Sequence, residues 1–223
     1  MNEELSSLIL GEKEVAVVLA RVDIFPETPV SDEETSRADS MSSTATRRGF
    51  LSGRRLVRNL LSRWLSMDSM NVPIRLSPDG RPYLEGGSYP RFSISHSGDL
   101  VMAAFSGEEV GADLELERPV DMTALSSRFF SHEEARLVSE QESNETFFRL
   151  WTCREAAIKA DGRGMAKLLG LTKVNARHQE GGFLNVEIGN DIWSVSHRVL
   201  DPAYHLAVAT KRRSSLIRWC DLR

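Results

Sequence analysis

The sequence predicts an α+β fold in which two similar α/β subdomains pack together as an intramolecular pseudodimer. The first observation is an internal repeat. Residues 92–96 and 193–197 share the pattern aromatic-Ser-aliphatic-Ser-His, and a short apolar segment follows each copy. The second is a basic amphipathic helix expected ahead of each copy, over 47–65 and 147–162. A pattern that occurs only twice is not a solenoid. We therefore expect two duplicated units packed face to face with a site at their junction, although a short repeat can also arise by chance.

Length and composition allow this arrangement. The chain has 223 residues, of which 41% are hydrophobic, so it can bury a core in one large domain or two small ones. We expect an N-terminal subdomain over 1–108 and a C-terminal subdomain over 109–223. Residues 26–46 are expected to form a loop or a short helical entry. Residues 121–143 look irregular, although Ser131 to Glu134 has the form of a helix capping box.

Composition also excludes several classes of protein. The net charge of −4 argues against nucleic-acid binding by bulk electrostatics, and no apolar run approaches the roughly 20 residues that span a bilayer. Residues 1–10 contain acids and lack a signal pattern. Cys153 and Cys220 have neither metal-binding nor redox spacing, which fits a reducing cytoplasm. Basic residues gather over 47–63 and 211–218, and the default explanation for each cluster is a solvated surface.

Two acids follow a short apolar lead-in over residues 110–115. Asp113 and Glu115 are two positions apart, so on a strand their side chains point to the same face. Neighbouring carboxylates repel each other unless a cation lies between them, and a hard divalent ion such as Mg²⁺ prefers oxygen ligands. The alternative is an exposed strand end with two solvated acids.

The second expected helix carries an acid and a base on one face. Trp151, Glu155 and Lys159 are spaced four apart, which places them one turn from each other. In one interpretation Glu155 is a third metal-binding carboxylate and Lys159 binds a phosphate. In the other they form a surface ion pair that stabilises the helix by roughly 0.2–0.5 kcal/mol.

A third segment offers hydrogen-bond donors rather than acids. Residues 91–98 alternate like a strand and run into a polar turn, and another turn is expected over 79–82. Arg81, Ser95 and His96 supply guanidinium, hydroxyl and imidazole groups, a set suited to a phosphate monoester. The alternative for His96 is a turn histidine bonded to backbone groups.

Together these segments resemble the 4′-phosphopantetheinyl transferases, in particular the larger surfactin-synthetase-type branch. The family pattern is a Gly-Lys-Pro turn, Ser-His-Ser, Gly-x-Asp-x-Glu and Trp-x-x-Lys-Glu-x-x-x-Lys. It is matched in order by residues 80–82, 95–97, 111–115 and 151–159. The stretch 50–58 also resembles the first long helix of the family. Arg81 and Arg154 stand where the family usually has lysine. They keep the charge but present it with a different geometry.

The resemblance implies a fold, an activity and partners. Members of this branch are intramolecular pseudodimers, so the chain is expected to be a monomer. They transfer the 4′-phosphopantetheine arm of coenzyme A to a serine of an acyl or peptidyl carrier protein, a small acidic helical domain, and release 3′,5′-ADP. Cations of this chain would then bind coenzyme phosphates or the acidic carrier. Which carrier and which pathway are involved cannot be read from the sequence.

The resemblance also implies roles for individual residues. Mg²⁺ is expected on Asp113, Glu115 and Glu155, and catalysis is expected from Asp113, Glu155 and Lys159. Glu155 is also the best candidate for the general base, and Glu134 is left open as a helix cap, a site residue or both. Coenzyme A is expected to contact six residues: Arg37, Arg48, Arg81, Ser95, His96 and Lys159.

Two rival functions remain at this point. One is a catalytically silent coenzyme A-binding scaffold or regulator, which would be expected to have lost a metal ligand or Lys159, whereas all are present. The other is a metal-dependent nuclease that uses Asp113, Glu115 and Glu155. The acidic net charge argues against the nuclease.

Overall fold

Each half of the chain contains a β-sheet and one long helix that packs against a face of that sheet. The computed structural model describes residues 14–223 except 88–89, 142, 181, 201–202 and 213–215. Its elements in chain order are β1 (Glu14–Arg21), α2 (Asp32–Asp39), α3 (Thr44–Leu65), η1 (Ser69–Asn71), β2 (Ile74–Leu76), β3 (Pro82–Leu84), η2 (Glu85–Gly87), β4 (Arg91–Ser97), β5 (Leu100–Ser106), β6 (Val110–Leu116), α4 (Met122–Phe129), α5 (His132–Gln141), α6 (Asn144–Asp161), α7 (Met165–Leu168), η3 (Leu169–Leu171), β7 (Thr172–Glu180), β8 (Phe183–Ile188), β9 (Asp191–Leu200), β10 (Tyr204–Thr210) and β11 (Leu216–Asp221).

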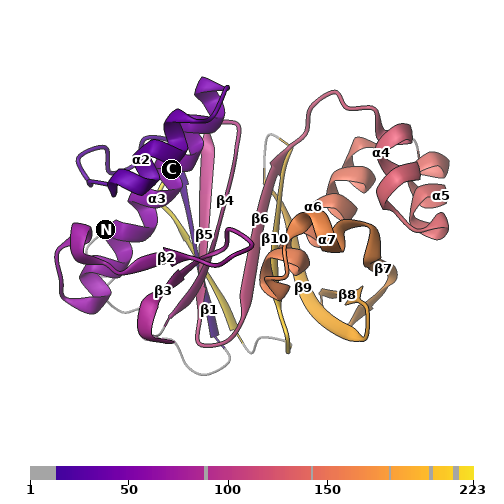
Figure 1. Ribbon diagram of the computed structural model, residues 1–223. Coiled ribbons are helices and arrows are strands. Elements are labelled where there is room, and N and C mark those ends of the chain that lie inside the picture. The colour runs from indigo at the N-terminus through magenta and orange to yellow at the C-terminus, as the bar shows by residue number, and fades with distance from the viewer. Residues whose placement is uncertain (1–13, 88–89, 142, 181, 201–202, 213–215) are drawn as a thin grey trace.

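The two sheets contain the same core unit. The first has the strand order β11-β1-β5-β4 and the second β6-β10-β9-β8-β7, with a separate β2-β3 hairpin (Figure 1). In both, a strand is followed by a long helix and then by two paired strands. The repeated histidines occupy equivalent places, because His96 of β4 pairs with Val101 of β5 and His197 of β9 pairs with Ala207 of β10. The predicted duplicated α+β unit is thereby confirmed.

The sheets pack against each other through their inner faces, and each long helix covers the outer face of its own sheet (Figure 1). Alternation along the strands produces this arrangement. On β1, Ala16 and Val18 face α3, whereas Val15 and Val17 enter the core between the sheets. That inner core comprises Val15, Val17, Leu19, Leu100, Met102, Ala104, Val110, Ala112, Leu114, Tyr204, Leu206 and Val208. The predicted pseudodimer is therefore the fold of this chain.

Two segments that looked irregular contain helices. Within 26–46, α2 begins with a capping box in which Ser31 and Glu34 each bond the other's backbone N–H. The prediction of an irregular 121–143 is wrong, because α4 and α5 occupy most of it. Helix α4 has only eight residues and α5 is mostly polar, so too few apolar positions recur to show a helical period.

The basic cluster on α3 is only partly solvated. Arg54 and Arg58 are buried, and Arg58 Nε lies 2.7 Å from the carboxylate of the buried Glu34. Arg48 is exposed and pairs with Asp23. A solvated face is therefore the wrong explanation for Arg54 and Arg58, whose charges are buried against an acid of α2.

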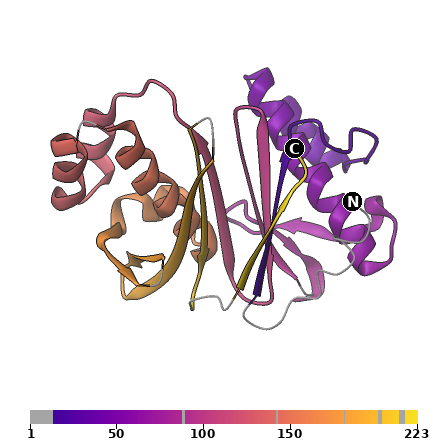
Figure 2. The same cartoon turned by 180° about the vertical axis from the view of Figure 1, so that it is seen from behind.

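The expected division at 108/109 falls in the loop between β5 and β6. Strand β11 nevertheless pairs in parallel with β1, and both views show the yellow strand beside the indigo one (Figures 1 and 2). Residues 216–221 thus belong to the first sheet, although they lie in the second half of the sequence. The expectation for residues 1–10, and Arg213 of the C-terminal basic cluster, lie outside the described residues. Among the described helices, none is long and apolar enough to cross a membrane.

Candidate active site

A glycine brings helix α6 unusually close to strand β6. A Cβ atom on Gly111 would lie 1.9 Å from the backbone oxygen of Ala156 and 2.4 Å from the nitrogen of Ala160, so only glycine fits there. On the same face of β6 follow Asp113 and Glu115, while Ala112 and Leu114 point into the inner core. The close approach therefore places the side chains of α6 directly over the two acids.

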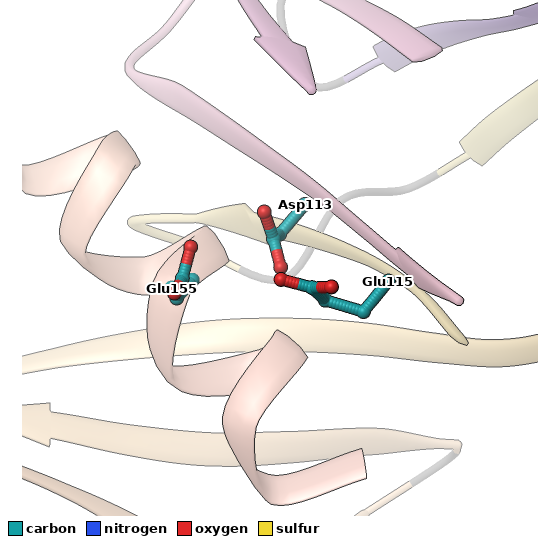
Figure 3. Close-up of side chains that lie close together, drawn as sticks. All are labelled: Asp113, Glu115 and Glu155. Atoms are coloured by element: carbon teal, nitrogen blue, oxygen red, sulfur yellow. The ribbon is translucent and has the colours of Figure 1, made fainter. Parts of the chain in front are cut away.

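Three carboxylates meet at this contact. Oxygen atoms of Asp113, Glu115 and Glu155 lie within 4.8 Å of one another. In Figure 3, Asp113 and Glu115 reach from the strand and Glu155 from the helix. Asp113 is 1% exposed. Its Oδ1 accepts hydrogen bonds from Ser95 Oγ at 2.9 Å and from Lys159 Nζ at 2.6 Å, while its Oδ2 is buried without a hydrogen-bond partner among the described residues.

Strand β4 reaches this cluster with three serines on one face. Ser95 bonds Asp113, and Ser97 donates to a carboxylate oxygen of Glu115 at 3.3 Å. Ser93 and Ser97 also accept from backbone N–H groups of β6, at 2.9 and 3.0 Å. Serine hydroxyls thus join the edge strands of the two sheets, and they orient both acids of β6 from the other half of the molecule.

Helix α6 begins with Ser143, whose hydroxyl accepts from the backbone N–H of Thr146. One turn before Glu155, Trp151 stacks on Phe147 with 5.8 Å between ring centroids. Burial and the neighbouring charges of Asp113 and Glu115 raise the pKa of Glu155 to about 8, against the opposing charge of Lys159. Burial and Asp113 likewise raise the pKa of Glu115. Glu155 is therefore protonated near neutral pH unless a cation joins the cluster.

Lys159 supplies a positive charge to the same cluster. Burial alone would lower its pKa, but Asp113 and Glu155 raise it above the ordinary value. Its ammonium also donates to Ser95 Oγ at 3.0 Å. Glu115 is balanced from outside by Arg118, at 2.8 Å. The two charged acids of β6 thus each have a cation beside them.

His96 lies at the edge of the cluster, half-buried against α3. A Cβ atom on Gly49 would come within 2.4 Å of its Nδ1, so the imidazole packs directly on the helix backbone. Burial and the charge of Lys159 lower the pKa of His96, although Asp113 opposes them. Burial and Lys159 therefore favour the neutral form of this ring, which packs against Gly49.

A pocket of about 350 Å³ lies beside the acids, and Lys159 is part of its wall. It also receives Arg37 from α2 and Arg81 from the turn before β3. Arg81 donates to the carbonyl oxygens of Ala160 and Val110 at 3.2 and 3.3 Å and pairs with Glu109, so it bridges the two halves. Three cations from distant parts of the sequence therefore line one pocket.

Not every predicted residue joins this pocket. The residues that line it include neither Arg48, which is paired with Asp23, nor Ser95 and His96. The sequence predicts coenzyme contacts for Ser95, whereas in the structure its hydroxyl donates to Asp113 and accepts from Lys159. Ser95 thus lies within the acidic cluster.

Glu134 and Arg154 form a separate buried pair. Glu134 accepts from the backbone N–H of Ser131, which completes the predicted capping box, and from Val174 N at 2.7 Å. Arg154 Nη2 lies 2.6 Å from Glu134, and Nη1 donates to three backbone oxygens. In the described structure Glu134 is outside the acidic cluster, so its contacts are structural. Burial raises the pKa of the Cys153 thiol to about 12, which agrees with a filler rather than a nucleophile.

The acidic cluster fits a hard divalent cation. It offers three carboxylates from two rigid elements, and the buried Oδ2 of Asp113 has no protein partner among the described residues. An all-oxygen ligand set is the one that Mg²⁺ and Mn²⁺ prefer. Within the described part of the chain, no other such group of His, Cys, Asp or Glu is found.

Sequence reasoning gave no role to Gly49, Gly111, Ser97 and Arg118. The two glycines act by lacking a side chain, which only their packing reveals. Ser97 continues the alternation of Ser93 and Ser95, and Arg118 stands three residues after Glu115. The available signals were therefore the matched motifs that contain Gly111 and Ser97, the serine alternation, and the short spacing of Arg118 from Glu115.

Comparison with known proteins agrees with this geometry. A family model described as "4′-phosphopantetheinyl transferase superfamily" matches residues 109–209, and one described as "4′-phosphopantetheinyl transferase, N-terminal" matches 27–108. The 4′-phosphopantetheinyl transferase ffp of Bacillus subtilis is 31% identical over 206 residues, which are 85% of this chain and 91% of that protein. The chain belongs to the 4′-phosphopantetheinyl transferase family.

Other members of the family show similar agreement. The transferase Sfp of Bacillus subtilis (strain 168) is 29% identical over 202 residues, 83% of this chain and 89% of Sfp. HetI of a Nostoc species is 35% identical over 149 residues, 62% of each chain. Both matched regions of this transferase contribute to the described site, because Ser95 comes from the first and Asp113 and Lys159 come from the second.

Proposed function

We propose that this transferase moves the 4′-phosphopantetheine arm of coenzyme A to a serine of an acyl or peptidyl carrier protein and releases 3′,5′-ADP. The observation that carries the proposal is that Lys159 belongs to two neighbouring features, the acidic cluster and the pocket. Its ammonium contacts Asp113 of a three-carboxylate cluster and also lines a pocket that holds Arg37 and Arg81. A site for a cation is thus joined to a site for phosphates, in a chain of this family.

We assign Mg²⁺ to Asp113, Glu115 and Glu155. When bound, the ion would supply positive charge to the oxygens of the reacting phosphate. Lys159 would bind the pyrophosphate, because it reaches both the acids and the pocket. Arg37, Arg81 and His96 are assigned to the nucleotide end. Ser95 is assigned to orienting Asp113 and Lys159 rather than to direct coenzyme contact.

In the proposed reaction the carrier serine oxygen attacks the phosphorus on the pantetheine side. A new oxygen–phosphorus bond forms, the bond to the bridging oxygen breaks, and its electron pair leaves with 3′,5′-ADP. The serine proton goes to Glu155, a carboxylate of the cluster that stands one helical turn from Lys159. Lys159 offsets the charge that grows on the leaving group, and such charge stabilisation is a major part of catalysis.

The acidic character of the carrier, a monomeric state and a cytoplasmic location remain predictions from the sequence, and the test below identifies which carrier is modified. The test is mass spectrometry of several apo-carriers incubated with the protein, coenzyme A and Mg²⁺. We expect a gain equal to one phosphopantetheine arm, absent when Mg²⁺ is chelated or when the carrier serine is alanine. Coenzyme binding without any gain on any carrier would favour the silent scaffold, and cleavage of nucleic acid without a carrier would favour the nuclease.

A further inference from the structure

Asp113 is both the partner of Lys159 in this structure and a proposed ligand of the divalent cation. Lys159 Nζ lies 2.6 Å from Oδ1 of Asp113, a carboxylate whose side chain is only 2% exposed. We propose that Lys159 competes with the divalent ion for Asp113, and that coenzyme A removes this competition by drawing the ammonium onto its pyrophosphate. The inference rests on the proposed function and adds to it a coupling between metal and coenzyme binding.

The competition follows from distance and charge. Mg–O bonds are about 2.1 Å long. Because Lys159 Nζ lies 2.6 Å from Oδ1 of Asp113, an ion on either oxygen of this carboxylate, including the unpartnered Oδ2, would stand within several ångströms of the ammonium. Two cations that close, in a site largely closed to water, repel each other strongly. Removing the ammonium would instead leave Asp113 with an unpaired charge for the ion to neutralise. Both effects weaken metal binding while the lysine stays in place.

The structure also offers the ammonium a second position. Lys159 is in the last turn of α6, its side chain is 27% exposed, and it lines the pocket that receives Arg37 and Arg81. A lysine carries its charge on a flexible four-carbon stem. The group can therefore turn from Asp113 toward an anion in the pocket while the helix stays fixed by the Gly111 contact.

Coupling of this kind is reciprocal. If coenzyme A strengthens metal binding by withdrawing the lysine, the metal strengthens coenzyme binding by the same factor. Part of any measured coupling also arises because coenzyme phosphates bind the ion directly. The part due to Lys159 is therefore isolated by measuring metal binding without coenzyme, where the phosphates make no contribution.

The experiment titrates Mn²⁺ and follows the free ion by its paramagnetic resonance signal, with and without coenzyme A. Without coenzyme, Lys159→Met should bind Mn²⁺ at least tenfold more tightly than wild type. Lys159→Gln, which is neutral but can still bond Ser95, should change in the same direction. Lys159→Arg keeps the charge and should stay close to wild type. The matched control is Lys211→Met, which removes a lysine from an exposed pair with Asp191 and should change nothing.

Equal affinities in wild type, Lys159→Met and Lys159→Gln without coenzyme would overturn the competition and leave the proposed function untouched. Tighter binding in Lys159→Arg as well would also overturn it, because the charge would not be the cause. Failure of wild type and all variants to bind Mn²⁺ even with coenzyme A would instead overturn the metal assignment itself. Circular dichroism melting verifies that each variant is folded before titration.

Discussion

The position of Glu155 on α6 places its carboxyl group among the other charges of the site. This residue stands one turn before Lys159 and shares its cluster with two acids of β6, which with burial raise its pKa to about 8. A carboxyl group in this position repels its neighbours when charged and attracts a cation when one is present. Replacing Glu155 should therefore lower the catalytic rate without lowering the stability of the fold.

We expect Glu155→Gln to lower kcat by at least ~10²-fold, because it removes a metal ligand and the proposed base. Thermal stability without a divalent ion should change little, since the Glu155 carboxyl, with a pKa raised to about 8, is already largely neutral there. Turnover and melting would be measured on the same preparations. Glu145→Gln, an exposed acid in the first turn of the same helix, is the matched control. A near wild-type rate in Glu155→Gln would overturn the roles of Glu155 as metal ligand and base.

A second group of titratable residues lies outside the cluster. His197 Nε2 is 3.1 Å from His205 Nδ1, and His205 Nε2 is 2.9 Å from Glu117. Burial, His205 and Arg149 lower the pKa of His197 to about 3, compared with 6.5 for an unfolded chain. Between these values the unfolded state binds the extra proton, so this histidine makes the protein less stable as the pH falls.

The wild-type protein should therefore lose stability from pH 7 to pH 5, by up to about 2 kcal/mol through His197. His197→Gln should show a correspondingly smaller loss. Urea unfolding at several pH values measures the slope for each protein. His132→Gln, which replaces an exposed histidine, is the control and should keep the wild-type slope. Identical slopes for wild type and His197→Gln would show that His197 is not held neutral.

At this scale the sequence predicted the site where chemistry depends on regular spacing. Asp113 and Glu115 share a face because strands alternate, and Glu155 and Lys159 share one because helices turn every 3.6 residues. That these two pairs of residues meet in one site could not be derived from spacing, since it depends on the packing of α6 on β6. The roles of Ser97 and Arg118, and the turn of Ser95 toward Asp113, depend on contacts between β4 and β6 or on side-chain reach.

At the scale of elements, the site depends on how closely α6 lies on β6. Gly111 sets that distance, because any side chain there would meet the backbone of Ala156. The elements themselves were partly predictable. The strand at 91–97 and the two long helices follow from periodicity, whereas α4 is too short and α5 too polar to show one.

Gly111→Ala should displace α6 and so lower both the stability of the fold and the rate of turnover. Overpacking of this kind costs about 1–3 kcal/mol, and turnover should fall further because Glu155 and Lys159 move with the helix. Urea unfolding and turnover are the measurements. Gly170→Ala is the matched control, since a Cβ atom there meets nothing within 4 Å. Wild-type stability in Gly111→Ala would contradict the close approach described here.

Besides the inner core, two connections link the two halves of the molecule. Serines of β4 bond β6 across the gap between the sheets, and β11 returns from the second half to pair with β1. The duplicated fold was visible in the repeat of residues 92–96 and 193–197. The return of β11 was not, because a strand carries no mark in its sequence of the sheet that it will join.

Ending the chain after Lys211 should destabilise the first sheet. Ile217 and Trp219 pack against the inner core and Leu222 against the core under α3. A fully buried side chain of this kind contributes about 1.5–3 kcal/mol, so these partly buried ones together should contribute several. Urea unfolding and turnover would be compared with a chain ended after Asp221, which keeps the strand and should lose much less. Equal stability of both truncated chains would show that β11 adds little to the sheet.

The parallel pair of β1 and β11 also has a consequence for protein synthesis. All other described elements leave the ribosome before residues 216–221, so β1 waits with one edge open. At 5–20 residues per second that interval is roughly 10 to 40 seconds. An open strand edge invites pairing with other chains. Newly made chains should therefore be most prone to aggregation until residues 216–221 have emerged, and a chaperone that shields strand edges would act on this protein in that interval.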